Sequence, residues 1–134
     1  MHIKDINTAH NRIRPHIHKT PILTNKSLNK LASANLYFKC ENFQKTGSFK
    51  IRGATNAVLM LKSDEIKNGI ATASSGNHGA ALSMAVSNLG GNTRVVMPEN
   101  TPKIKVNNVL RNGGEIIWCK PTQISRESVL KNLI

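Results

Sequence analysis

The sequence has few aromatic residues and few cysteines. Phe, Trp and Tyr make up 4% of its 134 residues, which leaves little for stacking against nucleic-acid bases. The two cysteines, Cys40 and Cys119, stand apart without CxxC spacing. This pattern argues against a zinc site and a disulfide scaffold, and it fits a reducing compartment.

The sequence also has no long apolar run. No stretch approaches the length that crosses a bilayer, and the N-terminal "MHIKDINTAH" lacks the apolar core of a secretory signal. We therefore expect a cytoplasmic protein without a membrane partner. The four histidines of residues 2–18 have no carboxylate or cysteine partners at ligand spacing, so we expect no metal site.

Acidic residues are scarce, since 7 Asp and Glu stand against 19 Lys and Arg, and the net charge is +12. Such a balance can indicate a nucleic-acid partner. The basic residues are spread singly and form no basic run, which argues against one. A second explanation is that the acidic counterpart of this basic chain lies elsewhere.

Strand and helix patterns alternate from about residue 35 onward. The predicted strands cover 35–40, 68–73, 93–98 and 115–119, and the predicted helices cover 48–62, 77–90, 102–114 and 122–134. Alternation of this kind predicts an α/β fold, an open twisted parallel sheet with flanking helices. A helix around 6–17, an extended segment 20–23 and a short helix 27–33 precede it. The apolar face of the last helix has no obvious partner within the sequence.

The stretch "TGSFKIRGA" places Lys50 where a loop becomes a helix. The positive end of the helix dipole, together with nearby Lys45 and Arg52, favours the neutral amine and lowers the lysine pKa. A neutral amine is a nucleophile, so Lys50 is a candidate for covalent chemistry with carbonyl compounds. The alternative is an ordinary solvated lysine at a helix start.

The stretch "ATASSGNHGAAL" forms a turn between a predicted strand and a predicted helix. Backbone N–H groups at such a helix N-terminus bind a carboxylate or a phosphate. It lacks the patterns of a Walker loop and of a dinucleotide site. The alternative is an ordinary Ser- or Asn-capped turn.

His78 in this turn is either a general base or a hydrogen-bonding residue. Because both stretches follow predicted strands, we expect them to face one cleft.

The two blocks "KCENFQKTGSFKIRGATNAV" and "ASSGNHGAALSMAV", together with "HKTPILTNKSLNKL" and "VVMPENTPKIKVNNVLRNGGEIIWC", resemble a known family. They are similar to the fold-type II pyridoxal-phosphate enzymes, in particular to the serine/threonine dehydratases and serine racemases. The likeness extends over nearly the whole chain, in the family's order, and it implies pyridoxal 5'-phosphate as the cofactor.

The resemblance implies a role for each residue of the two blocks. Lys50 would be the Schiff-base lysine, Phe49 would lie beside the cofactor ring, and Asn77 would donate a hydrogen bond to the oxygen on that ring. Ser75 would act as acid or base on the face opposite Lys50. The loop of Ser74, Ser75, Gly76, Asn77 and His78 would bind the substrate carboxylate.

The implied reaction is the dehydration and deamination of L-threonine or L-serine to a 2-oxo acid and ammonia, or racemisation of serine if Ser75 returns the proton. By analogy, residues 1–66 would open the larger domain and 67–134 would form most of the smaller one. Family members are more than twice as long and form homo-oligomers, and no glycine of a phosphate cradle follows Gly114. The alternative is a non-catalytic truncated remnant that binds small anions or a partner subunit.

Overall fold

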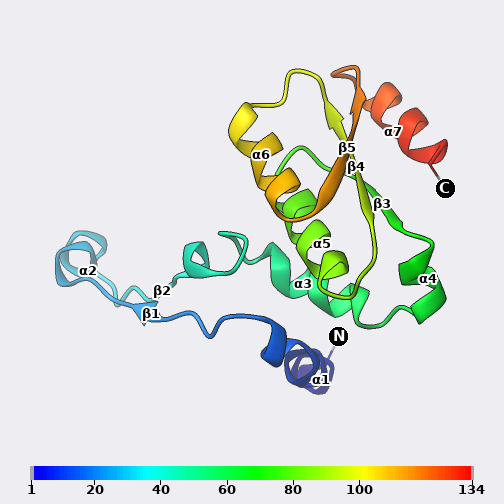
Figure 1. The fold of residues 1–134 in the computed structure, drawn as a ribbon. Coiled ribbons are helices and arrows are strands. Elements are labelled where there is room, and N and C mark those ends of the chain that lie inside the picture. Colours follow the sequence, from blue (N-terminus) through cyan, green and yellow to red (C-terminus); the bar gives the residue numbers. More distant parts are fainter. Residues whose placement is uncertain (1, 134) are drawn as a thin grey trace.

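The computed structural model describes residues 2–133, and a parallel sheet organises their C-terminal half. The sheet contains β3 (Ile70–Ala73), β4 (Thr93–Pro98) and β5 (Gly114–Cys119), in the order β3-β4-β5 (Figure 1). Ile70 lies opposite Thr93, and Thr93 lies opposite Gly114. The predicted α/β fold with a parallel sheet is confirmed.

Helices cover both faces of this sheet. α5 (Asn77–Ser87) leads from β3 to β4, α6 (Lys103–Arg111) leads from β4 to β5, and both lie on one side in Figure 1. α7 (Gln123–Lys131) lies on the other side and contacts all three strands. The expectation that the last helix has no partner is therefore wrong. Its Leu130 is half-buried, as is Leu133 just after it, and its Ile124 stays exposed.

The central strand is buried because helices lie on both of its faces. Val95, Val96 and Met97 of β4 are each 0% exposed. Gly79 allows α5 to approach this strand closely, since a Cβ at that position would lie 2.9 Å from Val95 Cγ1. The small residues of α5 thus set the spacing between helix and sheet.

The N-terminal half contains mostly short elements. They are α1 (Ile3–Ile13), a 3₁₀ turn (Arg14–His16), β1 (Ile22–Leu23), α2 (Lys26–Ala32), β2 (Phe38–Lys39), a 3₁₀ turn (Glu41–Phe43), α3 (Lys50–Val58) and α4 (Ser63–Lys67). β2 pairs antiparallel with β1 and not with the parallel sheet, which corrects the assignment of 35–40 to that sheet. The five-residue helix α4 was not predicted.

α3 and α5 pack together and join the two halves. One buried cluster contains Ile51, Ala54 and Val58 of α3 with Ala81, Leu82, Ala85 and Val86 of α5. The residue that follows Lys50 is therefore fixed against the helix that begins at Asn77. Within residues 2–133, the helices are too short or too polar to cross a membrane.

Candidate functional site

Lys50 is the first residue of α3, and its side chain is exposed. Its Nζ lies 5.1 Å from the centroid of the Phe49 ring, and Phe49 is itself 58% exposed. A cation over an aromatic face is weakly attracted to it. Both side chains are therefore accessible to a ligand, and the aromatic ring is the immediate neighbour of the amine.

Gln44 holds the loop that leads to Lys50. Its side-chain amide accepts from the His18 N–H at 2.8 Å and donates to the His18 carbonyl at 2.9 Å. The same oxygen accepts from the Lys45 N–H at 3.0 Å. Because Gln44 is buried, these bonds are shielded from water, and they tie the loop to the segment after α1.

Two hydroxyl groups in this loop are buried without a partner. Thr46 Oγ1 and Ser48 Oγ have no hydrogen-bond partner among the residues that the structure describes. An unpaired buried hydroxyl costs free energy, and such groups call for an explanation, of which a bound ligand is one. Gly47 stands between them with a φ of +74°, a backbone conformation that favours glycine.

Arg52, which follows Lys50 closely in α3, forms an ion pair with Glu41. Arg52 Nη2 and Nε donate to the two carboxylate oxygens at 2.7 and 2.8 Å, and Thr20 Oγ1 donates to the same carboxylate at 2.6 Å. The hydrogen bonds from Arg52 lower the pKa of Glu41 to about 2. Arg52 is therefore paired, and the positive potential expected from it beside Lys50 is weakened by the Glu41 carboxylate.

The N–H group and the hydroxyl oxygen of Ser74 both form hydrogen bonds within the protein. Its N–H donates to the Val96 carbonyl at 3.1 Å and so extends the ladder between β3 and β4. Its Oγ accepts from the Gly79 N–H at 3.0 Å and caps the start of α5. Of the donors that Ser74 has, only the hydroxyl hydrogen is left for a ligand.

The residues after Ser74 offer free donors. The N–H groups of Ser75, Asn77 and His78 have no acceptor within residues 2–133. The first N–H groups of a helix have no partner inside the helix, and the dipole makes that end attractive to anions. This turn can therefore bind a carboxylate or a phosphate.

A cavity of about 700 Å³ joins the two predicted stretches. Thr46 and Gly47 line it from the loop before Lys50, and Gly76 and Asn77 line it from the turn before α5. The remaining lining comes from α6: Ile104, Lys105, Asn107, Asn108 and Arg111. The expected common cleft is present for Asn77 and Gly76, whereas Phe49, Lys50 and His78 stand outside its lining.

Ser75 faces a second cavity, of about 280 Å³, at the carboxyl ends of the three parallel strands. Thr101 and Arg126 also line it, and their Oγ1 and Nε are buried without a partner among the described residues. Lys105 lines both cavities, so the two adjoin. Sequence reasoning missed Thr101, Lys105 and Arg126. Thr101 follows closely after the predicted strand 93–98, which was an available signal, whereas Lys105 and Arg126 stand within predicted helices.

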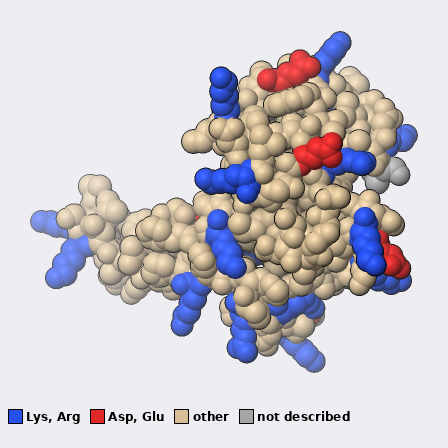
Figure 2. Space-filling model, viewed as in Figure 1, with Lys and Arg blue, Asp and Glu red and all other residues tan. Residues whose placement is uncertain are grey.

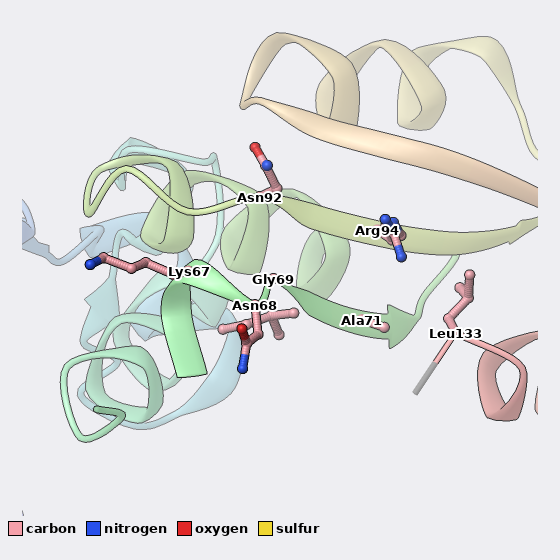
Figure 3. A pocket seen from close by; sticks show the side chains of 8 residues that line it. Lys67, Asn68, Gly69, Ala71, Asn92, Arg94 and Leu133 are labelled. Carbon is pink, nitrogen blue, oxygen red and sulfur yellow. The ribbon is translucent and has the colours of Figure 1, made fainter. Parts of the chain in front are cut away.

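A small cavity of about 90 Å³ lies at the opposite edge of the sheet, near the amino ends of β3 and β4. The labelled side chains of Lys67, Asn68 and Asn92 point in different directions and do not converge there (Figure 3). No predicted site residue lines this cavity. Three site candidates, Ser75, Gly76 and Asn77, therefore lie at cavities of the carboxyl edge, as expected for a parallel sheet.

Two curated relatives are similar over almost the whole chain. Serine racemase of Arabidopsis thaliana is 48% identical over 132 residues, which are 98% of this chain and 40% of the relative. β-Hydroxyaspartate dehydratase of Paracoccus denitrificans (strain Pd 1222) is 51% identical over 124 residues, which are 92% of this chain and 39% of the relative.

Solved structures have the same fold. Maize serine racemase superposes with a TM-score of 0.94 at 43% identity, over 98% of this chain and 40% of that protein. Threonine deaminase isoform 2 from Solanum lycopersicum superposes with a TM-score of 0.84 at 28% identity, over 99% of this chain and 38% of that protein.

The chain thus spans about 40% of the length of the curated relatives that it matches. The family model described as "Pyridoxal-phosphate dependent enzyme" matches residues 13–133, a range that includes both predicted stretches and both adjoining cavities. Sequence, fold and family model agree, and the chain belongs to the family of pyridoxal-phosphate dependent enzymes.

Proposed function

We propose that this chain carries the lysine and the amino-acid-binding turn of an enzyme that acts on L-serine or L-threonine with pyridoxal 5'-phosphate. The reaction is dehydration and deamination to a 2-oxo acid and ammonia, or racemisation of serine. The observation that carries the proposal is the cavity shared by the loop before Lys50 and the turn at Asn77. Relatives that are named serine racemase and β-hydroxyaspartate dehydratase support it.

Lys50, which stands outside the lining of this cavity, fits the aldehyde of the cofactor, and residues of the lining fit its ring. Lys50 offers an exposed amine, and Asn77 lines the cavity with an amide that can donate to a ring oxygen. Thr46 supplies an unpaired hydroxyl at the same wall. When bound, the cofactor supplies an electron sink that stabilises negative charge on the substrate Cα.

The turn before α5 suits the substrate carboxylate. Ser75, Asn77 and His78 present free N–H groups there, and the helix dipole adds to the attraction. The Ser74 hydroxyl hydrogen and the open backbone at Gly76 complete the set. In this proposal His78 acts through its backbone and not as a general base.

Two proton-transfer groups then serve the substrate Cα. Lys50 Nζ takes the α-proton, and Ser75 Oγ holds or returns a proton on the opposite face. Ser75 lines the cavity at the carboxyl ends of the strands, beside the turn that is proposed to bind the carboxylate, and this supports a role for its hydroxyl at the substrate. Loss of the β-hydroxyl followed by hydrolysis gives the 2-oxo acid and ammonia, whereas proton return from Ser75 inverts the amino acid.

We propose a division of the chain at the end of α4, with 1–66 opening the larger domain and 67–134 forming most of the smaller one. The sheet β3-β4-β5 lies wholly in the second part, which supports this division. We also propose that the whole protein forms a homo-oligomer and lies in the cytoplasm. The free thiols of Cys40 and Cys119 are compatible with that compartment.

Borohydride trapping tests the proposed lysine. The chain is mixed with pyridoxal phosphate, reduced and digested, and the modified peptide is identified by mass spectrometry. The adduct is expected at Lys50 and is expected to disappear in Lys50→Arg, whereas the matched variant Lys45→Arg keeps it. Equal labelling of many surface lysines would contradict the proposal.

The second candidate is a non-catalytic chain that binds small anions at the free N–H groups of the turn before α5. It is supported by the same N–H groups, which can bind an anion at the start of α5 without Lys50. Ammonia release from L-serine or L-threonine distinguishes the two. A Lys50 adduct without ammonia release supports the second candidate.

A further inference from the structure

Gln44 is a buried polar residue at the start of the loop that leads to Lys50, and 4% of it is exposed. Its side-chain oxygen accepts from the His18 N–H, and its side-chain nitrogen donates to the His18 carbonyl. One amide thus exchanges two hydrogen bonds with the backbone of one residue, as a neighbouring antiparallel strand does. The pairing fixes the direction of the amide as well as its position, because the two bonds cannot form if the oxygen and the nitrogen exchange places.

Gln44 also holds the turn that follows it. The Gly47 N–H donates to the Gln44 carbonyl at 2.8 Å, which closes a four-residue turn over 44–47. The Lys45 N–H donates to the side-chain oxygen of Gln44 at 3.0 Å. The two N–H groups of this turn that are bonded therefore both end on Gln44.

The Lys50 amine stands between two anchors of different kinds. On its C-terminal side, Ile51 is 1% exposed and lies in the cluster that joins α3 to α5. On its N-terminal side, no side chain of residues 45–49 forms a hydrogen bond within residues 2–133, and the hydroxyls of Thr46 and Ser48 are buried without a partner there. The nearest polar anchor before Lys50 is therefore the amide of Gln44.

We infer that Gln44 is a positioning residue for Lys50. Through its two hydrogen bonds to His18, it fixes the loop and thereby the place of the Lys50 amine relative to the aldehyde of a bound cofactor. The misplacement of a reacting group by about 1 Å can lower a rate about a hundredfold. The inference deepens the proposed function and rests on it, because it assigns Gln44 a role only through Lys50.

Site-selective labelling with pyridoxal phosphate and borohydride tests this role. Figure 2 shows Lys and Arg side chains spread over the face displayed, so many amines compete for the reagent. The quantity measured is therefore the ratio of label at Lys50 to label at all other lysines. Gln44→Glu keeps the acceptor for the His18 N–H and loses the donor to the His18 carbonyl, and it is expected to lower the ratio about tenfold. Gln44→Met removes every side-chain hydrogen bond of Gln44 and is expected to lower the ratio further.

Val96→Ala is the matched control for a loss of stability alone. Val96 is 0% exposed in β4, and strand alternation places it on the face opposite Val95 and Met97, which pack against α5 and α6. The variant is expected to unfold at a lower urea concentration and to keep the labelling ratio of the parent. An equal fall of the ratio in Val96→Ala and in Gln44→Glu would overturn the inference, as would an unchanged ratio in both Gln44 variants.

Hydrogen exchange separates the inference from the proposed function, because it needs no cofactor. The amides of Lys45 and Gly47 are expected to exchange about tenfold faster in Gln44→Glu than in the parent, because local opening no longer breaks the full set of bonds. Val96→Ala is expected to leave their exchange unchanged. Equal exchange in the parent and both Gln44 variants would overturn the inference. A parent chain without label at Lys50 would instead contradict the proposed function, and the exchange would still decide whether Gln44 holds the loop.

Discussion

The two halves of the chain differ in how completely they bury their own surface. Residues 67–133 contain a parallel sheet with helices on both faces, and Val95, Val96 and Met97 are 0% exposed. Residues 2–66 contain a two-stranded ribbon, and Leu31 and Tyr37 are 84% and 74% exposed. The C-terminal half has a core of its own, whereas the N-terminal half is held mainly by α3 against α5.

The largest expected effect tests this contrast directly. Met97→Ala removes a fully buried side chain from the central strand and should lower the free energy of unfolding by about 2–5 kcal/mol. Leu31→Ala, at an exposed position, should change it by less than about 0.5 kcal/mol. Urea unfolding measures both, and similar losses in the two variants would show that the halves are equally packed.

A smaller effect concerns the ion pair that supports the loop before Lys50. Because the pKa of Glu41 is lowered from 4.5 to about 2, its stabilisation is fully present above pH 4.5 and is lost as the pH falls toward 2. Glu41→Gln should lower the free energy of unfolding by about 1–3 kcal/mol near pH 7. It should also flatten the dependence of thermal unfolding on pH below 4.5.

The matched control for this pair is Glu115→Gln. Glu115 faces Arg94 at 3.6 Å, and both side chains are more than half exposed. Exposed pairs contribute about 1 kcal/mol or less. An equal pH response in the two variants would contradict a special role for Glu41.

The smallest expected effect on stability separates neighbouring serines, Ser74 and Ser75. Ser74→Ala removes the cap on the Gly79 N–H and should cost about 1 kcal/mol of stability. Ser75→Ala should leave stability within about 0.5 kcal/mol, because Ser75 makes no such bond in the described residues, and should abolish inversion of serine if the proposed role holds. Thermal unfolding and chiral chromatography of the products measure the two effects, and unchanged inversion in Ser75→Ala would contradict that role.

Local patterns predicted most of the elements. The apolar strands at 68–73, 93–98 and 115–119 and the helices between them are where the sequence places them, because each pattern is long enough to show its period. The strand at 35–40 was assigned to the wrong sheet, since a strand pattern does not name its pairing partner. The five residues of α4 are too few to show a helical period.

The candidate site was predicted in part. Phe49, Lys50 and the turn from Ser74 to His78 were predicted from two motifs. Gly76 and Asn77 share a cavity with the loop before Lys50, but Lys50 does not line that cavity, so its place in a common cleft stays a prediction. The buried Arg126 Nε and Thr101 Oγ1 beside Ser75 were not foreseen. Their burial results from the meeting of three strand ends, which no single stretch of sequence contains.

The sequence by itself determined the order of strands and helices, the excess of positive charge and the family, because these depend on residue types and their spacing. Only the tertiary structure decided that Arg52 is paired with Glu41, that Ser74 caps α5, and that Ser75 and Asn77 face different cavities. The physical reason is that a hydrogen bond or an ion pair depends on distances of about 3 Å between groups that folding brings together.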